Sequence, residues 1–205
     1  MLQIFVLLIL KIAFRTTIEG VDKIPEKGAI LLCPNHQSYI DPFLISALIP
    51  GRLLNRLLFT GFGELFDKAP LSWLVRPLRV IRIATTETFG ESLKLSYDGL
   101  RRGLALLIFP EGRRTPTGNI MPPRTGAGIL SVEANAPIVP ILIVGATRTL
   151  SPIHPELRFP RVRVIVGDPI EPPPIQDHSE ENYQKIVDRW RDSVLEMESN
   201  LGLKQ

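Results

Sequence analysis

Residues 29–43 of the chain read Ala29-Ile30-Leu31-Leu32-Cys33-Pro34-Asn35-His36-Gln37-Ser38-Tyr39-Ile40-Asp41-Pro42-Phe43. The first five are an apolar run with the length and composition of a buried strand. Polar residues follow directly, and they include His36 and Asp41, which are separated by four residues. In open α/β sheets, ligands bind beyond the carboxyl ends of the strands. The stretch therefore predicts a sheet with buried strands and a functional site at its edge.

His36 and Asp41 have the composition of a catalytic pair. An imidazole titrates near neutrality. A carboxylate on one ring nitrogen fixes the tautomer and stabilises the imidazolium, so the other nitrogen can take a proton from a hydroxyl. No serine or cysteine nucleophile motif stands beside the pair, which indicates that the hydroxyl belongs to a substrate. A structural alternative stays open, because Asp41-Pro42 is also a good helix start with Asp as N-cap.

A second apolar run, Leu104–Phe109, ends in Pro110-Glu111-Gly112-Arg113-Arg114-Thr115. Two arginines, a flexible glycine and a hydroxyl at the end of a strand suit an anion. A phosphate suits them best, because guanidinium groups pair with its oxygens in a fork. The alternative is a solvated basic turn.

Together the two segments resemble motifs of the glycerolipid acyltransferase family, of the 1-acylglycerol-3-phosphate acyltransferase type. That family carries Asn-His-x4-Asp and, further on, Phe-Pro-Glu-Gly-Thr-Arg-Ser. The matches here are Asn35, His36 and Asp41, then Phe109, Pro110, Glu111, Gly112 and Arg114, while Arg113 stands at the usual threonine and Thr115 keeps the hydroxyl of the serine. A third element, residues 136–141, resembles the family's later strand. The three elements stand in the family's order and cover residues 14–170.

A further family element departs from its pattern. It usually reads Lys-Glu-Leu and later Ile-Pro-Val-Asp-Arg, but the corresponding segment here has Gly63 at the lysine and Ala84-Thr85 at the Asp-Arg pair. The candidates to supply the missing positive charge are Arg76, Arg79 and Arg82. The segment is closest to acyltransferase domains fused to acyl-activating synthetases or transporters. We therefore expect fusion to, or association with, an acyl-activating synthetase.

The resemblance implies a reaction and a role for each matched residue. A fatty acyl group would pass from an acyl thioester, acyl-CoA or acyl carrier protein, to the free hydroxyl of a lysophospholipid such as 1-acylglycerol-3-phosphate. His36 would be the general base and Asp41 its orienting partner, with direct attack through one tetrahedral intermediate. The acceptor's phosphate would be bound by Glu111, Gly112, Arg113, Arg114, Arg82 and Arg124. No metal or bound cofactor is expected, because the thioester itself carries the energy for the transfer.

Two other functions stay open. One is a thioesterase or other hydrolase in which His36 activates water, although the arginine pair would then have no acceptor phosphate to bind. The other is a catalytically silent lipid-binding membrane module.

The composition and the net charge of the chain limit the classes of partner that it is expected to bind. The 205 residues are enough for one domain with a real core, and 44% of them are hydrophobic. The net charge is +3, and the excess is arginine-rich near the candidate site, which suits an anionic lipid surface or a phosphorylated ligand. Nucleic acid is not expected, because no binding motif for it is present. The single cysteine, Cys33, excludes an intrachain disulfide and a zinc cluster.

The first fourteen residues, Met1–Phe14, are almost wholly apolar. They are too few for a spanning helix, which needs about 20, and Lys11 and Arg15 fall on one helical stripe with Gln3. An interfacial helix over residues 1–15 fits best, followed by an acyltransferase domain over 16–205. We expect peripheral or monotopic attachment to the cytoplasmic face of a membrane. A signal peptide and a helix buried in the core are the alternatives.

Beyond this segment strand-like and helix-like patterns alternate, which predicts an α/β fold, a single-domain mixed sheet flanked by helices. The expected strands are 29–33, 80–84, 104–109, 138–144 and 162–166, and the expected helices are 43–59, 71–75, 88–102, 128–135 and 182–201, the last with its start at Asp177-x-x-Glu180. The apolar side chains of 43–59 suit an acyl-chain tunnel, a bilayer surface with Arg52 and Arg56 at the headgroups, or ordinary core packing.

Overall fold

The computed structural model describes residues 8–9, 11–62, 79–83, 89–174 and 178–202. In this part of the chain seven strands form one sheet in the order β1-β7-β6-β2-β5-β3-β4. Their bounds are β1 Thr17–Glu19, β2 Ile30–Pro34, β3 Leu57–Phe62, β4 Arg79–Ile83, β5 Ala105–Leu107, β6 Ile138–Val144 and β7 Arg163–Val166. Neighbouring strands are parallel except β6 and β7, so β1 and β7 run against the other five. The predicted mixed α/β sheet is confirmed.

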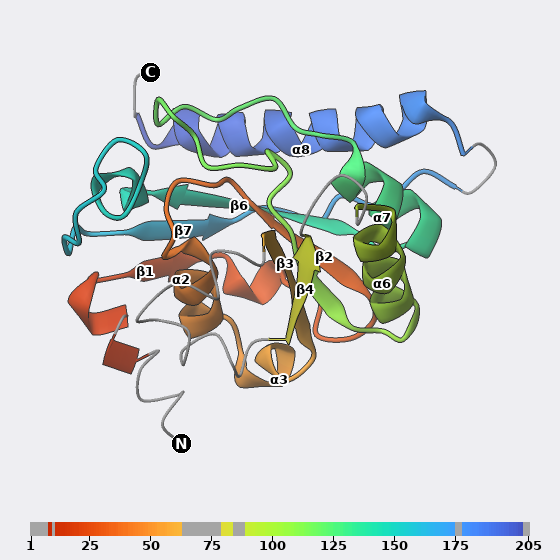
Figure 1. Cartoon of the computed structure of the whole chain (residues 1–205), viewed down its shortest axis with the longest axis horizontal. Helices are drawn as coiled ribbons and strands as arrows, with labels where there is room; N and C mark the ends of the chain where they lie inside the picture. The colour runs from red at the N-terminus through yellow and green to blue at the C-terminus, as the bar shows by residue number, and fades with distance from the viewer. Residues whose placement is uncertain (1–7, 10, 63–78, 84–88, 175–177, 203–205) are drawn as a thin grey trace.

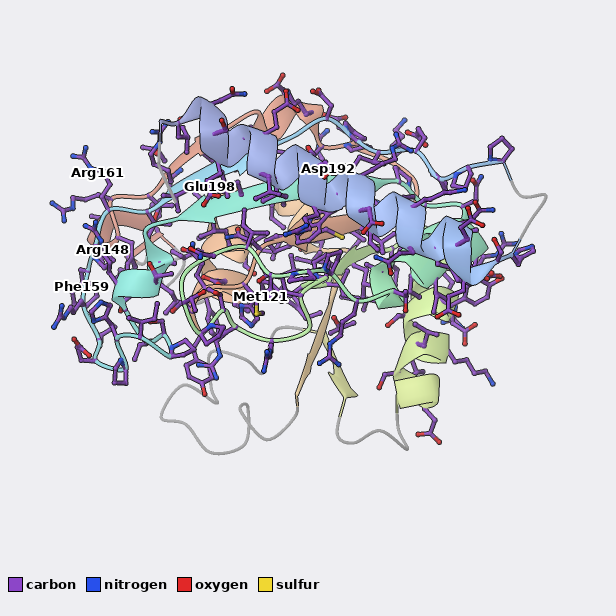
Figure 2. The ribbon with its side chains drawn as sticks, turned by 90° about the horizontal axis from the view of Figure 1, so that it is seen from above. Met121, Arg148, Phe159, Arg161, Asp192 and Glu198 are labelled. Atoms are coloured by element: carbon purple, nitrogen blue, oxygen red, sulfur yellow. The ribbon has the colours of Figure 1, made fainter. Side chains whose placement is uncertain are left out.

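Helices cover both faces of this sheet (Figure 1). On one face lie α6, α7 and α8, and on the other lie α2 and α3; Figure 2 shows α8 lying lengthwise over the strands. The bounds are α2 Asp41–Leu48, α3 Gly51–Leu54, α6 Phe89–Arg101, α7 Gly126–Ala134 and α8 Glu180–Asn200, with 3-10 turns η1 Val21–Lys23 and η2 Ala146–Arg148. Buried apolar side chains form two hydrophobic cores, one on each face of the sheet.

Strand β2 shows why the opening stretch of sequence is apolar throughout. It lies between β5 and β6, and all five of its residues are buried. Ile30 and Leu32 face one core, whereas Leu31 and Cys33 face the other, as the two-residue period of a strand requires. Because β2, β5 and β6 are parallel, the segments that follow them meet at one edge of the sheet.

One expected helix was wrong, and one strand was not expected. The expected helix over 43–59 stops at Leu48, resumes for one turn in α3 after Pro50-Gly51, and gives way to β3 at Leu57. Leu57 and Phe59 are buried in one core while Leu58 packs against the other, so this run is a two-faced inner strand. The strand β1 was not expected, and its three residues alternate exposed and half-buried at the sheet edge.

The apolar side chains of α2 and α3 belong to the core. Leu44, Ile45 and Leu53 are at most 4% exposed. Arg56, expected at lipid headgroups, donates hydrogen bonds to the carbonyls of Pro25, Glu26, Gly28 and Gly103. Core packing is therefore the confirmed interpretation of this segment.

The last helix begins at Glu180, and its N-cap is Ser179, whose side chain accepts a hydrogen bond from the Asn182 N–H. The expected start residue Asp177 lies outside the described residues, as do the expected helix 71–75, Arg76, and Gly63 with Ala84-Thr85.

The described part of the N-terminal segment is helical at residues 8–9 and 11–13. Leu8, Ile9 and Ile12 are 52%, 47% and 67% exposed, whereas Phe14 is fully buried in the core. Because Leu8, Ile9 and Ile12 are exposed, the alternative of a helix buried in the core is wrong for the described residues of this segment. None of the helices in the described part of the chain combines the length and the apolar character that crossing a bilayer requires.

Candidate active site

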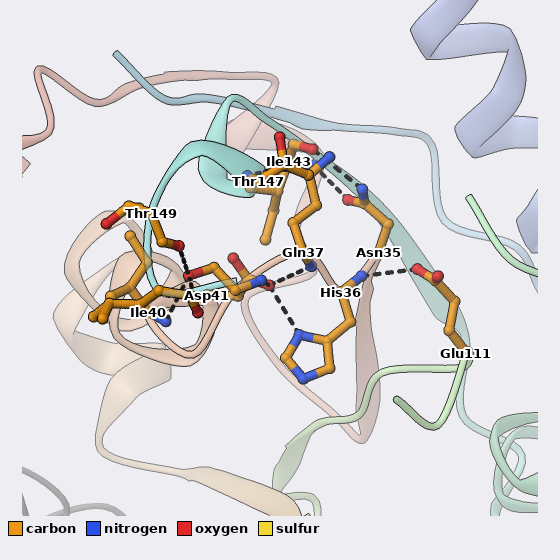
Figure 3. A network of polar contacts seen from close by, with 11 residues as sticks. Asn35, His36, Gln37, Ile40, Asp41, Glu111, Ile143, Thr147 and Thr149 are labelled. Carbon is orange, nitrogen blue, oxygen red and sulfur yellow. Dashed lines mark hydrogen bonds and ion pairs between the residues drawn. The ribbon is translucent and has the colours of Figure 1, made fainter. Parts of the chain in front are cut away.

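The loop between β2 and α2 brings His36 and Asp41 together. His36 Nδ1 lies 2.9 Å from Asp41 Oδ2 (Figure 3). The Asp41 side chain is fully buried, and that of His36 is 17% exposed. Because Asp41 occupies Nδ1, Nε2 is the ring nitrogen that can meet a substrate. This is the geometry of a histidine base held by a carboxylate.

Asp41 also shapes the loop that carries His36. Its Oδ2 accepts the backbone N–H groups of Gln37 and Ser38, both at 2.7 Å. The expected N-cap role is wrong in detail: α2 begins at Asp41 itself, the N-cap is Ile40, and the carboxylate binds the turn before the helix. The carboxylate thus holds both the ring and the backbone of the loop.

The face of the His36 ring is covered by Phe109, which follows β5. The two rings stack with centroids 3.9 Å apart and an interplanar angle of 19°. The stacking covers one face of the imidazole while Nδ1 faces Asp41. Phe109 was matched to the family motif, but nothing in its local sequence indicated this contact with His36.

Glu111 connects the two motif segments. Its Oε1 accepts the His36 N–H at 2.8 Å, and its Oε2 accepts the Met121 N–H at 3.1 Å. The side chain is 3% exposed, and burial raises the pKa of Glu111 to about 7. Placed among the phosphate ligands by the sequence resemblance, Glu111 instead directs both oxygens to backbone groups and holds the loops in place.

The arginines lie on the open side of the same edge. Arg113 and Arg124 are exposed, and Arg114 is half-buried with its guanidinium carbon 3.4 Å from the ring centroid of Tyr39. Gly112 has φ +72°, and a Cβ there would come within 2.8 Å of Arg124 Cδ and Nε. The Arg114 guanidinium therefore lies over a residue of the His36 loop, and the Arg124 side chain packs against Gly112 of the loop that pairs with it, a suitable setting for an anionic group.

Arg82, the remaining predicted phosphate ligand, lies in β4 opposite Gly61 of β3. Its side chain is outside the description, so its role stays a prediction. Within the described residues no group of three or more His, Cys, Asp or Glu side chains is placed to hold a metal ion.

The thiol of Cys33 is buried away from the catalytic pair. Its side chain packs in the core under α8, on the far side of β2, and burial raises the pKa of its thiol. The carbonyl of Cys33 accepts a hydrogen bond from Trp190 Nε1 at 2.7 Å.

Three residues outside the predicted set of catalytic and phosphate-binding residues tie the His36 loop to β6 and to the segment that follows it. Asn35 exchanges two hydrogen bonds with the backbone of Ile143, at 3.1 and 2.6 Å. Ser38 Oγ donates to the carbonyl of Thr149 at 2.6 Å, and Gln37 Oε1 accepts the Thr147 N–H at 3.3 Å (Figure 3). Asn35 carries a sequence signal, because it matches the Asn of the Asn-His-x4-Asp motif and directly follows a buried strand, whereas Gln37 and Ser38 carry none.

A buried histidine–carboxylate pair beside a cluster of arginines, at the carboxyl edge of a mixed sheet, agrees with the comparison of this chain with known proteins. The chain belongs to the acyltransferase family, whose model, described as Acyltransferase, matches residues 15–144.

Two curated relatives carry a more specific name. The 1-acyl-sn-glycerol-3-phosphate acyltransferase alpha of Bos taurus is 25% identical over 185 residues, which are 88% of this chain and 62% of the bovine protein. A probable 1-acyl-sn-glycerol-3-phosphate acyltransferase of Mycoplasma pneumoniae is 29% identical over 191 residues, 87% of this chain and 69% of that protein. The chain thus spans about three fifths of the length of the bovine relative.

One solved structure shares the fold. The 1-acyl-sn-glycerophosphate acyltransferase PlsC of Thermotoga maritima superposes with a TM-score of 0.72 over 96% of this chain and 81% of its own, at 21% sequence identity. A similarity at this level of identity shows the fold alone.

Proposed function

We propose that this chain transfers a fatty acyl group from an acyl thioester to the free hydroxyl of a lysophospholipid, with 1-acylglycerol-3-phosphate as the acceptor type. The observation that carries the proposal is the His36–Asp41 pair at 2.9 Å, with the Arg114 guanidinium stacked on Tyr39 of the same loop. The names of the curated relatives support the same acceptor.

In the proposed reaction His36 Nε2 takes the proton of the acceptor's hydroxyl while the oxygen attacks the thioester carbonyl. A new C–O bond forms and a tetrahedral intermediate results. When it collapses, the C–S bond breaks, and the imidazolium returns its proton to the leaving thiolate. Asp41 stabilises the imidazolium between these two proton transfers.

The arginines bind the acceptor's phosphate in this proposal. Arg114 stacks on Tyr39, which holds its guanidinium near the His36 loop. Arg113 and Arg124 add charge of the same sign, and Arg82 stays a predicted fourth ligand. Glu111 acts through the backbone of His36 and is a positioning residue.

The donor and the partners belong to the same proposal. Acyl-CoA and acyl carrier protein are both thioesters, and an associated acyl-activating synthetase stays a prediction. No metal or resident cofactor takes part in these steps. Attachment to the cytoplasmic face of a membrane, through the N-terminal segment, would bring the enzyme to its lipid acceptor.

A panel of lysolipid acceptors, each offered with labelled acyl-CoA or labelled acyl carrier protein, tests the function. We expect labelled diacyl product with phosphate-bearing lysolipids and little with neutral monoacylglycerol, and no product from His36→Ala. Release of free labelled fatty acid without transfer would make the protein a thioesterase. If no combination of acceptor and donor gave labelled diacyl product or free fatty acid, the protein would be a catalytically silent lipid-binding module.

A further inference from the structure

Away from the catalytic pair, the exposed large apolar side chains of the described residues are concentrated on two neighbouring segments. One is the N-terminal helix, with Leu8, Ile9 and Ile12. The other we call the rim loop, residues 150–161, which follows η2; its Ile153, Leu157 and Phe159 are 40%, 57% and 52% exposed. Exposed apolar side chains that lie grouped on neighbouring segments mark an interaction surface, whereas single ones such as Leu95 need no explanation.

The rim loop joins the N-terminal helix to the active-site loop. On one side the rings of Phe14 and Phe159 lie 5.2 Å apart, and Arg15 Nη2 donates to the Phe159 carbonyl at 3.2 Å. On the other side the Tyr39 N–H donates to the Leu150 carbonyl at 3.1 Å. The rim loop therefore contacts both the N-terminal segment and the loop that carries His36, and its exposed apolar side chains form a border between them.

This border is cationic. Residues 146–161 contain the three arginines Arg148, Arg158 and Arg161 against one carboxylate, Glu156, which pairs with Arg158. Arg148 and Arg161 are exposed, and Figure 2 shows both at the same end of the molecule as Phe159. Lys11 and Arg15 extend the same charge along the N-terminal helix, and both are exposed.

Apolar side chains flanked by arginines and lysines are the composition of a surface that enters the headgroup layer of an anionic bilayer. We propose that the rim loop docks on an anionic lipid bilayer, with Ile153, Leu157 and Phe159 among the acyl chains and Arg148 and Arg161 at the headgroups. The purpose of this docking rests on the proposed function, because it would set the His36 loop at the surface that holds a lysophospholipid. Binding itself is measured without catalysis.

A tryptophan reporter tests insertion directly in the full chain. Leu157→Trp is compared with Leu95→Trp, because Leu95 on α6 is equally exposed, at 57%, and lies outside the rim loop. With vesicles of phosphatidylcholine and phosphatidylglycerol, we expect the Leu157→Trp emission to shift to the blue and to be quenched by brominated acyl chains. The parent chain has two tryptophans of its own, so the control is the change on adding vesicles: the Leu95→Trp chain should show no larger change than the parent chain. Equal behaviour of the two reporters would overturn the proposal.

Co-sedimentation with the same vesicles gives the second measurement. Leu157→Ser with Arg161→Glu should weaken partitioning at least about tenfold, because it removes apolar area and reverses a charge at the headgroups. The matched control, Leu95→Ser with Lys94→Glu on α6, should bind like the parent. If the rim-loop variant binds as well as the control, the bilayer is not the partner of this surface, and a protein partner takes its place.

Activity on detergent-dispersed acceptor separates this inference from the proposed function. A rim-loop variant that loses vesicle binding but keeps detergent activity supports both. If no form of the chain transfers acyl groups, yet binding still follows Leu157 and Arg161, the proposed function fails and the docking surface stands.

Discussion

Glu111 Oε1 accepts the backbone N–H of His36 at 2.8 Å, across 75 positions of sequence. The second carboxylate oxygen accepts the Met121 N–H at 3.1 Å, so one buried side chain holds the histidine loop and the arginine-bearing loop together. Buried carboxylates that accept backbone N–H groups fix the loops around them, because leaving such donors unpaired costs about 1–3 kcal/mol each. The relationship predicts effects of Glu111 on both stability and activity.

Burial raises the pKa of Glu111 from its ordinary 4.5 to about 7, so the folded chain binds this proton more tightly than the unfolded chain. The favourable contribution is present in full below about 4.5 and is lost as the pH rises to about 7. Glu111→Gln should therefore flatten the decline of the unfolding free energy between these values, measured by urea denaturation at several pH values. Parallel pH curves for the two proteins would mean that Glu111 does not titrate in this range.

Glu111→Gln should also lower kcat, because its amide NH₂ must face one of the two N–H donors. Acceptor KM should change less than kcat, since the arginines remain. An unchanged kcat would remove Glu111 from the positioning of His36.

The catalytic pair gives the largest expected effect on rate. His36→Ala and Asp41→Asn should each lower turnover at least about a hundredfold, the scale of general acid–base catalysis. Asp41→Asn should also reduce stability, because Oδ2 accepts three hydrogen bonds and Oδ1 is buried with no partner among the described residues. Circular dichroism checks that the fold persists. Near-normal activity of His36→Ala would refute the proposed base.

Substitutions of Arg114 and of its stacking partner Tyr39 should raise the acceptor KM by different factors. Arg114→Ala should raise the acceptor KM about tenfold or more, the loss of a charge-assisted hydrogen bond, with the donor KM little changed. Arg114→Lys should rescue only in part, because the fork is lost. Tyr39→Leu should raise the acceptor KM about two- to fivefold, as expected for a cation–π contact, and Tyr39→Phe should restore it. Equal effects on donor and acceptor KM would assign Arg114 to the donor's phosphates.

Gly112 combines a left-handed backbone with contact to Arg124. Gly112→Ala should cost about 1 kcal/mol of stability for the positive φ alone, and should also push Arg124 aside and raise the acceptor KM. Gly103→Ala is the matched control, because Gly103 has φ +76° and a Cβ added there would meet nothing within 4 Å. The two variants should lose similar stability, but only Gly112→Ala should change the acceptor KM. If both variants raised the acceptor KM, the cause would be the strained backbone and not the contact with Arg124.

The N-terminal segment is tested by substitution, because removing Phe14 would open the core. Replacing Leu8, Ile9 and Ile12 together by Ser should release much of the protein from anionic vesicles and leave activity on detergent-dispersed short-chain acceptors intact. These side chains are exposed, so the fold should not depend on them. Undiminished vesicle binding would leave the rim loop as the main docking surface.

Several features of this protein follow from local sequence. The five-residue run 30–34 is apolar because both faces of its strand are covered, and that pattern is visible without a structure. His36 and Asp41 are five positions apart in one loop, so their contact needs only the turn that connects them. The order of the motifs carries the family resemblance for the same reason: each motif is a short, continuous segment.

Other features depend on contacts between distant segments. Residues 57–62 are apolar enough for helix or strand, and they are a strand because β4 and β5 supply hydrogen-bonding partners on both sides. The family resemblance predicts Glu111 as a phosphate ligand, and only the parallel pairing of β2 with β5 brings its carboxylate to the backbone N–H of His36. The joining of Phe14 to Phe159 likewise exists only in the folded chain. Local patterns reflect the torsional and burial preferences of each residue, whereas the choice of partner is made by the collective packing of the whole sheet.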